Sequence, residues 1–173
     1  MVAGNADSTI TVLNEDSLRQ VQMKEAFGIF SDFTTGENEK INLKNDLVSL
    51  SFSSKGGALT EATLNKYKTH DSLPLTLFDE KDNEYGFIFK TGGRIVNTTD
   101  LFFKPIAGKD GKSVTMRLDF GNGKFFDLVY TLPEDSYMVK MDIRQKGMET
   151  ILPGNTASLD LFWNQNLRSQ EKG

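Results

Sequence analysis

The feature that most constrains the fold of this chain is a two-residue alternation of apolar and polar side chains. In the clearest stretch, residues 114–120, Val, Met, Leu and Phe alternate with Thr, Arg and Asp. Such a period is typical of a strand with one buried and one wet face. From residue 39 onward we predict extended segments at residues 41–43, 47–52, 58–66, 75–78, 85–90, 114–120, 126–132, 137–143 and 159–163.

Turn signals separate these segments at short intervals. Gly56-Gly57 and Gly121-Asn122-Gly123 supply residues that tolerate positive φ, and Pro133-Glu134-Asp135-Ser136 is a further turn. Parallel strands need crossover connections, usually helices of about 10–15 residues, and no helical stretch of that length lies between the segments. The sequence therefore predicts a mainly β, antiparallel sandwich.

The first 38 residues follow a different pattern. Residues 1–13 are small and polar, and we interpret them as an irregular lead-in. Asp16 or Ser17 is a suitable N-cap for a short helix that runs to about Phe30. Residues 34–38 indicate a linker. We therefore divide the chain into a tail with a short helix, residues 1–38, and a β domain, residues 39–173.

Composition excludes several function classes. The net charge is −4, which argues against nucleic-acid binding because that needs a basic face. With no cysteine, the chain has no thiolate zinc site, iron–sulfur cluster or cysteine nucleophile. No apolar run approaches the roughly 18 residues of a membrane span, and residues 1–4 do not resemble a signal peptide. An export signal or anchor would lie outside this sequence.

Two segments invite a metal-site hypothesis. His70, the sole histidine, lies in a polar loop, where we interpret it as a solvated residue. Residues 79–84 are rich in carboxylates, but Lys81 interrupts them and the central glycine of a calcium loop is missing. A charged hairpin loop explains this segment better. We predict no catalytic residue, no cofactor and no metal.

Three aromatic residues are candidates for an interaction site: Trp163, Tyr67 and Tyr85. Trp163 alternates with two leucines, and this placement predicts a position in the core or at its rim. The alternative is a platform on which a sugar or a peptide stacks. That alternative requires the three aromatic rings to face the surface.

Several segments together resemble a known family, the extracytoplasmic domain of YidC-type membrane protein insertases, in the long form of the Bacteroidetes. The strand and turn N-D-L-V-S-L-S-F-S-S-K-G-G at residues 45–57 is followed by L-N-K-Y at 64–67 and P-L-T-L-F-D at 74–79. S-V-T-M-R-L at 113–118 and Y-T-L-P-E-D-S-Y-M-V at 130–139 continue the match. L-F-W-N-Q at 161–165 and R-S-Q-E-K-G at 168–173 complete it. The similarity spans residues 39–173.

The resemblance implies a non-enzymatic role. It implies a β-supersandwich of the galactose-mutarotase-like kind, on the periplasmic face of the bacterial inner membrane, in a multi-pass protein that assists membrane protein insertion and folding. The implied partners are the Sec translocon with its accessory subunits and nascent membrane proteins. The family's sandwich continues beyond Gly173, so this chain holds about its N-terminal half. Open edges of such a half would favour a homo-oligomer, a strand swap or a bound neighbour.

A second hypothesis comes from another class of protein. The supersandwich fold also occurs in carbohydrate-binding and mutarotase-like domains, and fold alone does not decide function. Mutarotase-type proton transfer needs a histidine and a carboxylate in one cleft. A single loop histidine gives that chemistry little support, which leaves sugar binding by exposed aromatic residues as the alternative.

Overall fold

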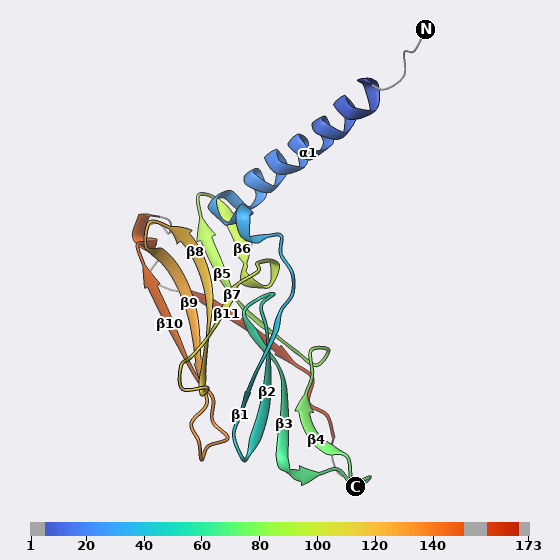
Figure 1. The fold of residues 1–173 in the computed structure, drawn as a ribbon, viewed down its shortest axis with the longest axis vertical. Helices are drawn as coiled ribbons and strands as arrows, with labels where there is room; N and C mark the ends of the chain where they lie inside the picture. The colour runs from blue at the N-terminus through green and yellow to red at the C-terminus, as the bar shows by residue number, and fades with distance from the viewer. Residues whose placement is uncertain (1–5, 151–158, 170–173) are drawn as a thin grey trace.

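The computed structural model describes residues 6–150 and 159–169 and contains eleven strands in three sheets. All the strand pairs within these sheets are antiparallel (Figure 1). The first sheet is a meander in the order β1-β2-β3-β4. Its strands are β1 (Lys40–Lys44), β2 (Val48–Ser53), β3 (Ala58–Lys68) and β4 (Pro74–Phe78).

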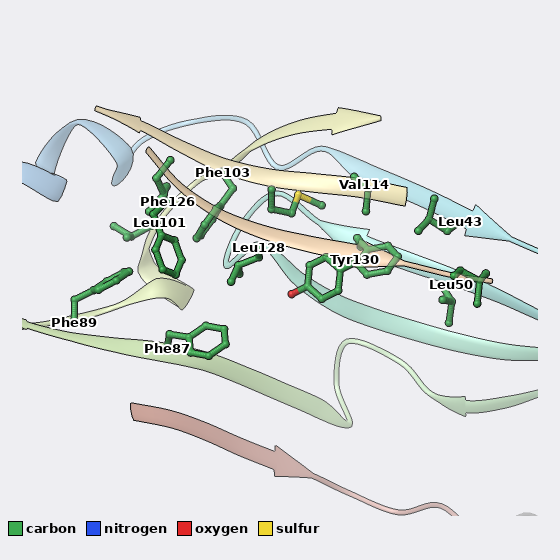
Figure 2. Packing of buried hydrophobic residues seen from close by; sticks show 14 of the residues in the cluster. Leu43, Leu50, Phe87, Phe89, Leu101, Phe103, Val114, Phe126, Leu128 and Tyr130 are labelled. Carbon is green, nitrogen blue, oxygen red and sulfur yellow. The ribbon is translucent and has the colours of Figure 1, made fainter. Parts of the chain in front are cut away.

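Two further sheets face each other across the core. One has the order β10-β9-β8-β7, and the other has the order β11-β5-β6. Figure 2 shows side chains of β5 and β9 meeting between them. Their strands are β5 (Asn83–Thr91), β6 (Arg94–Asn97), β7 (Lys104–Ala107), β8 (Ser113–Gly121), β9 (Lys124–Thr131), β10 (Lys140–Lys146) and β11 (Asp160–Gln165).

The mainly β, antiparallel fold predicted from the alternation is thus confirmed. The predicted segments correspond to nine of the eleven strands, with ends displaced by a few residues. β6 and β7 were missed; both are short, with four residues each. The likeness to galactose-mutarotase folds and the division at residue 38 stay predictions.

The N-terminal helix is longer than its sequence predicts. Helix α1 spans Ala6–Phe27, so it begins ten residues before the expected Asp16 cap and replaces most of the expected irregular lead-in. It ends three residues before Phe30, because Gly28 adopts a positive φ of 58° and the chain continues as the 3-10 helix η1 (Gly28–Phe33). The expected linker lies between η1 and β1.

The core is built from the inward faces of all three sheets. Phe89 of β5 meets Phe126 of β9 edge to face, with ring centroids 5.0 Å apart. Phe52 of β2 packs on Tyr130 of β9 at 4.8 Å, which joins the meander to the other sheets. Figure 2 shows Phe89, Phe126 and Tyr130 within this core. The largest fully buried side chains are Tyr130, Phe30, Phe52, Phe89, Phe126, Leu101, Met116, Leu118, Leu128, Leu132, Met148 and Val96.

One end of the core is closed by η1. Phe30 is completely buried and stacks on Phe89 at 4.8 Å, and Phe30 and Phe33 both contact Phe120 at the end of β8. Arg94 of β6 donates from Nε to the Glu25 carbonyl at 2.6 Å, which supplies a donor to the last turn of α1. These contacts hold the end of the helix against the β domain.

The opposite side of the core stays open, contrary to the burial that the alternation predicts there. On the segment predicted at 137–143, Tyr137, Met141 and Ile143 are 43%, 36% and 42% exposed, and regular pairing begins only at Lys140. β10 and β11 are the edge strands of their sheets. Among the described residues, no further strand lies outside them to cover their apolar side chains.

The predicted Gly56-Gly57 turn is present and shows why both positions are glycine. Their φ angles are 81° and 62°. A Cβ on Gly57 would lie 3.0 Å from the Phe103 ring and 3.2 Å from Cβ of Met116. The turn therefore needs both the left-handed backbone and the missing side chain.

Candidate functional site: an apolar cleft between the sheets

A cleft of about 230 Å³ opens on the uncovered side of the sandwich. One wall comes from β5 and β11, the other from β9, β10 and the segment before β10, and β3 and β4 close one end. Its lining residues are Leu59, Phe78, Asn83, Tyr85, Tyr130, Val139, Met141, Leu161 and Trp163. We call this surface the apolar cleft.

The floor of the apolar cleft is a chain of hydrogen bonds with a fixed direction. Tyr130 donates its hydroxyl proton to the Gly57 carbonyl at 2.8 Å. Because that proton is used, Tyr85 must be the donor in the 2.8 Å contact between the two hydroxyls. The Tyr85 oxygen in turn accepts from the Leu59 N–H at 2.8 Å. Both ends of this chain of hydrogen bonds lie at the start of β3, at Gly57 just before the strand and at Leu59 within it.

A bulge in β3 makes this arrangement possible. The register of β2 and β3 shifts so that Ser51 pairs with Glu61 and Phe52 with Leu59, which leaves Thr60 as the extra residue. A bulge interrupts the regular ladder locally. Leu59 directs its N–H to Tyr85 and its carbonyl to Asn83, whose Nδ2 donates at 3.0 Å.

The rim of the apolar cleft is formed by Trp163. Its side chain is 65% exposed, and its Nε1 donates to Oδ1 of Asn83 at 2.8 Å. Its ring lies 6.0 Å from that of Tyr85, measured between centroids. The Trp163 indole is therefore fixed in orientation by a hydrogen bond at its edge while one face remains open.

The electrostatics of the apolar cleft do not suit acid–base chemistry. Burial raises the pKa of Tyr85, and burial together with the neighbouring Tyr85 hydroxyl raises the pKa of Tyr130 well above its ordinary value. Both phenols stay protonated at neutral pH and serve as hydrogen-bond donors. Among the described residues that line it, none is a carboxylate, histidine, lysine or arginine. A general base with a pKa near 7 is thus missing from these residues.

The structure brings together two of the three predicted site residues. Trp163 and Tyr85 are neighbours in the apolar cleft, but Tyr85 is only partly exposed and its hydroxyl is engaged. Tyr67 lies near the end of β3 and is 53% exposed, and it does not line the cleft. The requirement that all three rings face the surface is therefore met by Trp163 and Tyr67 and not by Tyr85.

Two other residues of the site were not singled out from the sequence. Tyr130 falls in the strand predicted at residues 126–132, and a tyrosine among buried Phe and Leu residues signals a buried hydrogen-bond partner. Asn83 accepts from Trp163 and donates to Leu59. The sequence gives no local signal for this role, because the bonds join residues 80 and 24 positions apart.

The acidic segment at residues 79–84 is not the predicted hairpin loop: it connects β4 to β5, which belong to different sheets, and it holds a guanidinium group. Arg168 donates to Oδ2 of Asp79 at 2.6 Å and also contacts Asp82. The Lys81 N–H donates to Oδ1 of Asp79 at 2.8 Å, and this bond and Arg168 lower the pKa of Asp79. Arg168 thus supplies the positive charge that a metal ion would supply in a calcium-binding loop.

Other sequence candidates occupy ordinary surroundings. His70 lies in the loop between β3 and β4 beside Asp71, with Nε2 3.0 Å from Oδ2 and its side chain 44% exposed. Within residues 6–150 and 159–169, no group of three or more side chains is arranged to hold a metal ion. Over the same residues, no helix has the length and apolarity needed to cross a bilayer.

The described residues thus form an antiparallel β domain with an open apolar cleft on one side. Comparison with known proteins gives the family. The family model of the YidC periplasmic domain matches residues 40–171. The chain belongs to this family, the YidC periplasmic domain.

Curated relatives agree with this assignment. The chain is 43% identical over 159 residues to the membrane protein insertase YidC of Parabacteroides distasonis, a match that covers 91% of this chain and 25% of the relative. For the protein of the same name from Porphyromonas gingivalis strain W83 the identity is 37% over 158 residues, with the same shares covered. The chain spans about a quarter of the length of these relatives. No solved structure matches it.

Proposed function

We propose that this chain is a non-catalytic interaction domain, which gives the insertase a docking surface on the periplasmic face of the inner membrane. The observation that carries this proposal is the make-up of the apolar cleft. Its lining offers apolar side chains and one open indole face, and it contains no acid–base pair. Such a surface suits protein contacts better than covalent chemistry.

The proposed partners are those of the family. They are the Sec translocon with its accessory subunits, and nascent membrane proteins on their way into the bilayer. Exposed aromatic residues are frequent anchors of protein interfaces, which makes Trp163 and Tyr67 the first residues to test. Tyr85 contributes by holding the floor on which Trp163 packs.

A pull-down from detergent-solubilised native membranes tests this proposal, with the whole 173-residue chain as bait. We expect recovery of Sec translocon or accessory subunits, and a loss of recovery with Trp163→Ser or Tyr67→Ser. The matched control is Ile95→Ser, which removes a 74% exposed apolar side chain from β6, at the other edge of the sheet from β11. Recovery that all three substitutions leave unchanged would count against these two anchors, and no recovery of translocon components would count against the proposed partners.

One observation favours a second candidate function, carbohydrate binding. The open face of the Trp163 indole is a surface on which a sugar ring can stack. Against it, the described polar groups of the cleft already bond to one another: Asn83 to Trp163 and Leu59, and Tyr85 to Tyr130. Saturable binding on a glycan array that Trp163→Ala abolishes and Ile95→Ala leaves intact would favour this alternative.

A further inference from the structure

Strand β11 buries little apolar surface. Leu161 and Trp163 are 51% and 65% exposed, and Phe162 on the other face is half-buried. Its neighbour β5 differs, because Phe87 and Phe89 are 3% and 0% exposed. Hydrophobic burial therefore contributes much less to the attachment of β11 than to that of β5.

An ion pair holds the first residue of β11. Asp160 pairs with Ile88 in the antiparallel ladder, and its carboxylate lies 2.5 Å from Nζ of Lys90, two residues further along β5. The Lys90 and Asp160 side chains are 63% and 44% exposed. Salt screens a pair with this exposure effectively.

A second set of contacts holds the other end. Gln165 pairs with Asn83, and the Asn166 N–H donates to the Asp82 carbonyl at 2.7 Å, which extends the ladder by one bond. Arg168 then binds Asp79 and Asp82. The side chains of Arg168, Asp79 and Asp82 are 39%, 35% and 10% exposed, so this end is less accessible to salt than the Lys90 pair.

Between these two clamps, the fit of β11 against β5 depends on contacts at Gly86 and Asn83. A Cβ on Gly86 would lie 2.9 Å from Cε1 of Phe162, so the absence of a side chain there lets Phe162 lie against β5. On the opposite face, Trp163 bonds to Asn83. β11 is thus a short edge strand, held by its six-residue backbone ladder with β5, by charge at both ends and by one side-chain hydrogen bond between them.

We propose that β11 is a detachable strap: the Lys90–Asp160 pair and the Arg168 clamp hold it on β5, and weakening them releases β11 while the rest of the domain stays folded. Release removes the Trp163 wall of the apolar cleft and frees the edge of β5. The core strands do not depend on these ion pairs, because they are held by buried aromatic and aliphatic side chains. This inference concerns a conformational device and goes beyond the proposed interaction role.

Hydrogen exchange of backbone amides tests the strap, because local opening and global unfolding give different patterns. In Lys90→Ala/Arg168→Ala we expect the amides of β11 to exchange about tenfold faster or more, with β8 and β9 unchanged. Lys112→Ala is the matched control, since it removes a surface ion pair with Glu134 at 3.0 Å on another sheet. The emission of Trp163, the sole tryptophan, should report the same opening.

A salt titration of the unmodified chain keeps the test decisive if the double variant does not fold. Raising NaCl from about 0.1 M to 1 M shortens the Debye length from about 10 Å to 3 Å. We expect β11 to exchange faster, and β10, the edge strand of the opposite sheet, to change less. Exchange in β11 that neither salt nor the substitutions alter would overturn the proposal. Equal acceleration in β9 would overturn it as well, because the opening would then be global.

Discussion

The two ends of the sandwich core are both rich in aromatic residues, yet only one of them is closed. At the first end η1 places Phe30 over Phe89 and beside Phe120, and Phe30 is completely buried. At the other, Tyr85 and Trp163 are neighbours on the paired strands β5 and β11 and line an open cleft, and Trp163 is 65% exposed.

This difference teaches that a strand's own pattern does not decide whether its apolar face is buried. Apolar side chains line one face of β11 as they line one face of β8, but β8 is an inner strand and faces a second sheet whereas β11 is an edge strand. Burial requires a covering element. At the closed end a six-residue 3-10 helix is sufficient, because two of its residues are phenylalanines.

The substitution Phe30→Ala should have the largest effect, because it removes that covering side chain. Replacing a fully buried phenylalanine by alanine costs about 3–5 kcal/mol, since it loses apolar burial and leaves a cavity. Urea denaturation followed by circular dichroism measures the free energy of unfolding. A loss of less than about 1 kcal/mol would show that η1 is not part of the cooperative core.

Tyr130→Phe should have the next largest effect, because it breaks the hydrogen-bond chain in the cleft floor. It leaves the Gly57 carbonyl without its donor and Tyr85 without its acceptor, which costs about 1–3 kcal/mol of unfolding free energy. Tyr85→Phe alone and the double variant complete a double-mutant cycle. We expect the double variant to lose less than the sum of the single variants, because the two hydroxyls bond to each other. Strictly additive losses of unfolding free energy would contradict the chain of hydrogen bonds described for the cleft floor.

Trp163→Ala should change stability by about 1 kcal/mol or less, in contrast to Phe30→Ala, because the ring is mostly exposed and its loss removes one hydrogen bond. The same urea titration measures both variants side by side. A loss comparable to that of Phe30→Ala would show that the open end is in fact covered in solution, for example by a second copy of the chain.

Acidification should have the smallest effect, and on the open side it should act through Asp79. The Lys81 N–H and Arg168 lower the pKa of Asp79 below its unfolded value of about 3.9. A depressed carboxyl pKa contributes stability above the unfolded value, and that contribution is lost as pH falls through the folded value. We therefore expect amides of β11 to lose protection below about pH 4, and this loss to be smaller in Arg168→Ala. If the β11 amides lose protection at low pH equally with and without Arg168, the assignment of this loss to the Asp79–Arg168 pair would be contradicted.

The strands were predictable to the extent that their pattern is local. Alternation and glycine turns located nine strands, including the Gly56-Gly57 turn with its positive φ angles. The cleft was only partly predictable. Trp163 and Tyr85 were candidates, but their meeting depends on the pairing of β11 with β5, which joins residues that lie 78 positions apart at that point. The Arg168 clamp was missed for the same reason, as its partners precede it by 89 and 86 positions.

The junction between α1 and η1 has a mechanical consequence. Helix α1 projects from the β domain in Figure 1, and its 22 residues correspond to a rod of about 33 Å. The helix is followed by η1, in which the Phe30 ring is buried in the core, and Arg94 donates a hydrogen bond to the last helical turn. Tilting the helix would pull on the buried Phe30 ring. The last turn of the helix is thus attached to the β domain through η1 and Arg94, so a force that tilts the helix would act first on the Phe30 contacts and on the Arg94 hydrogen bond.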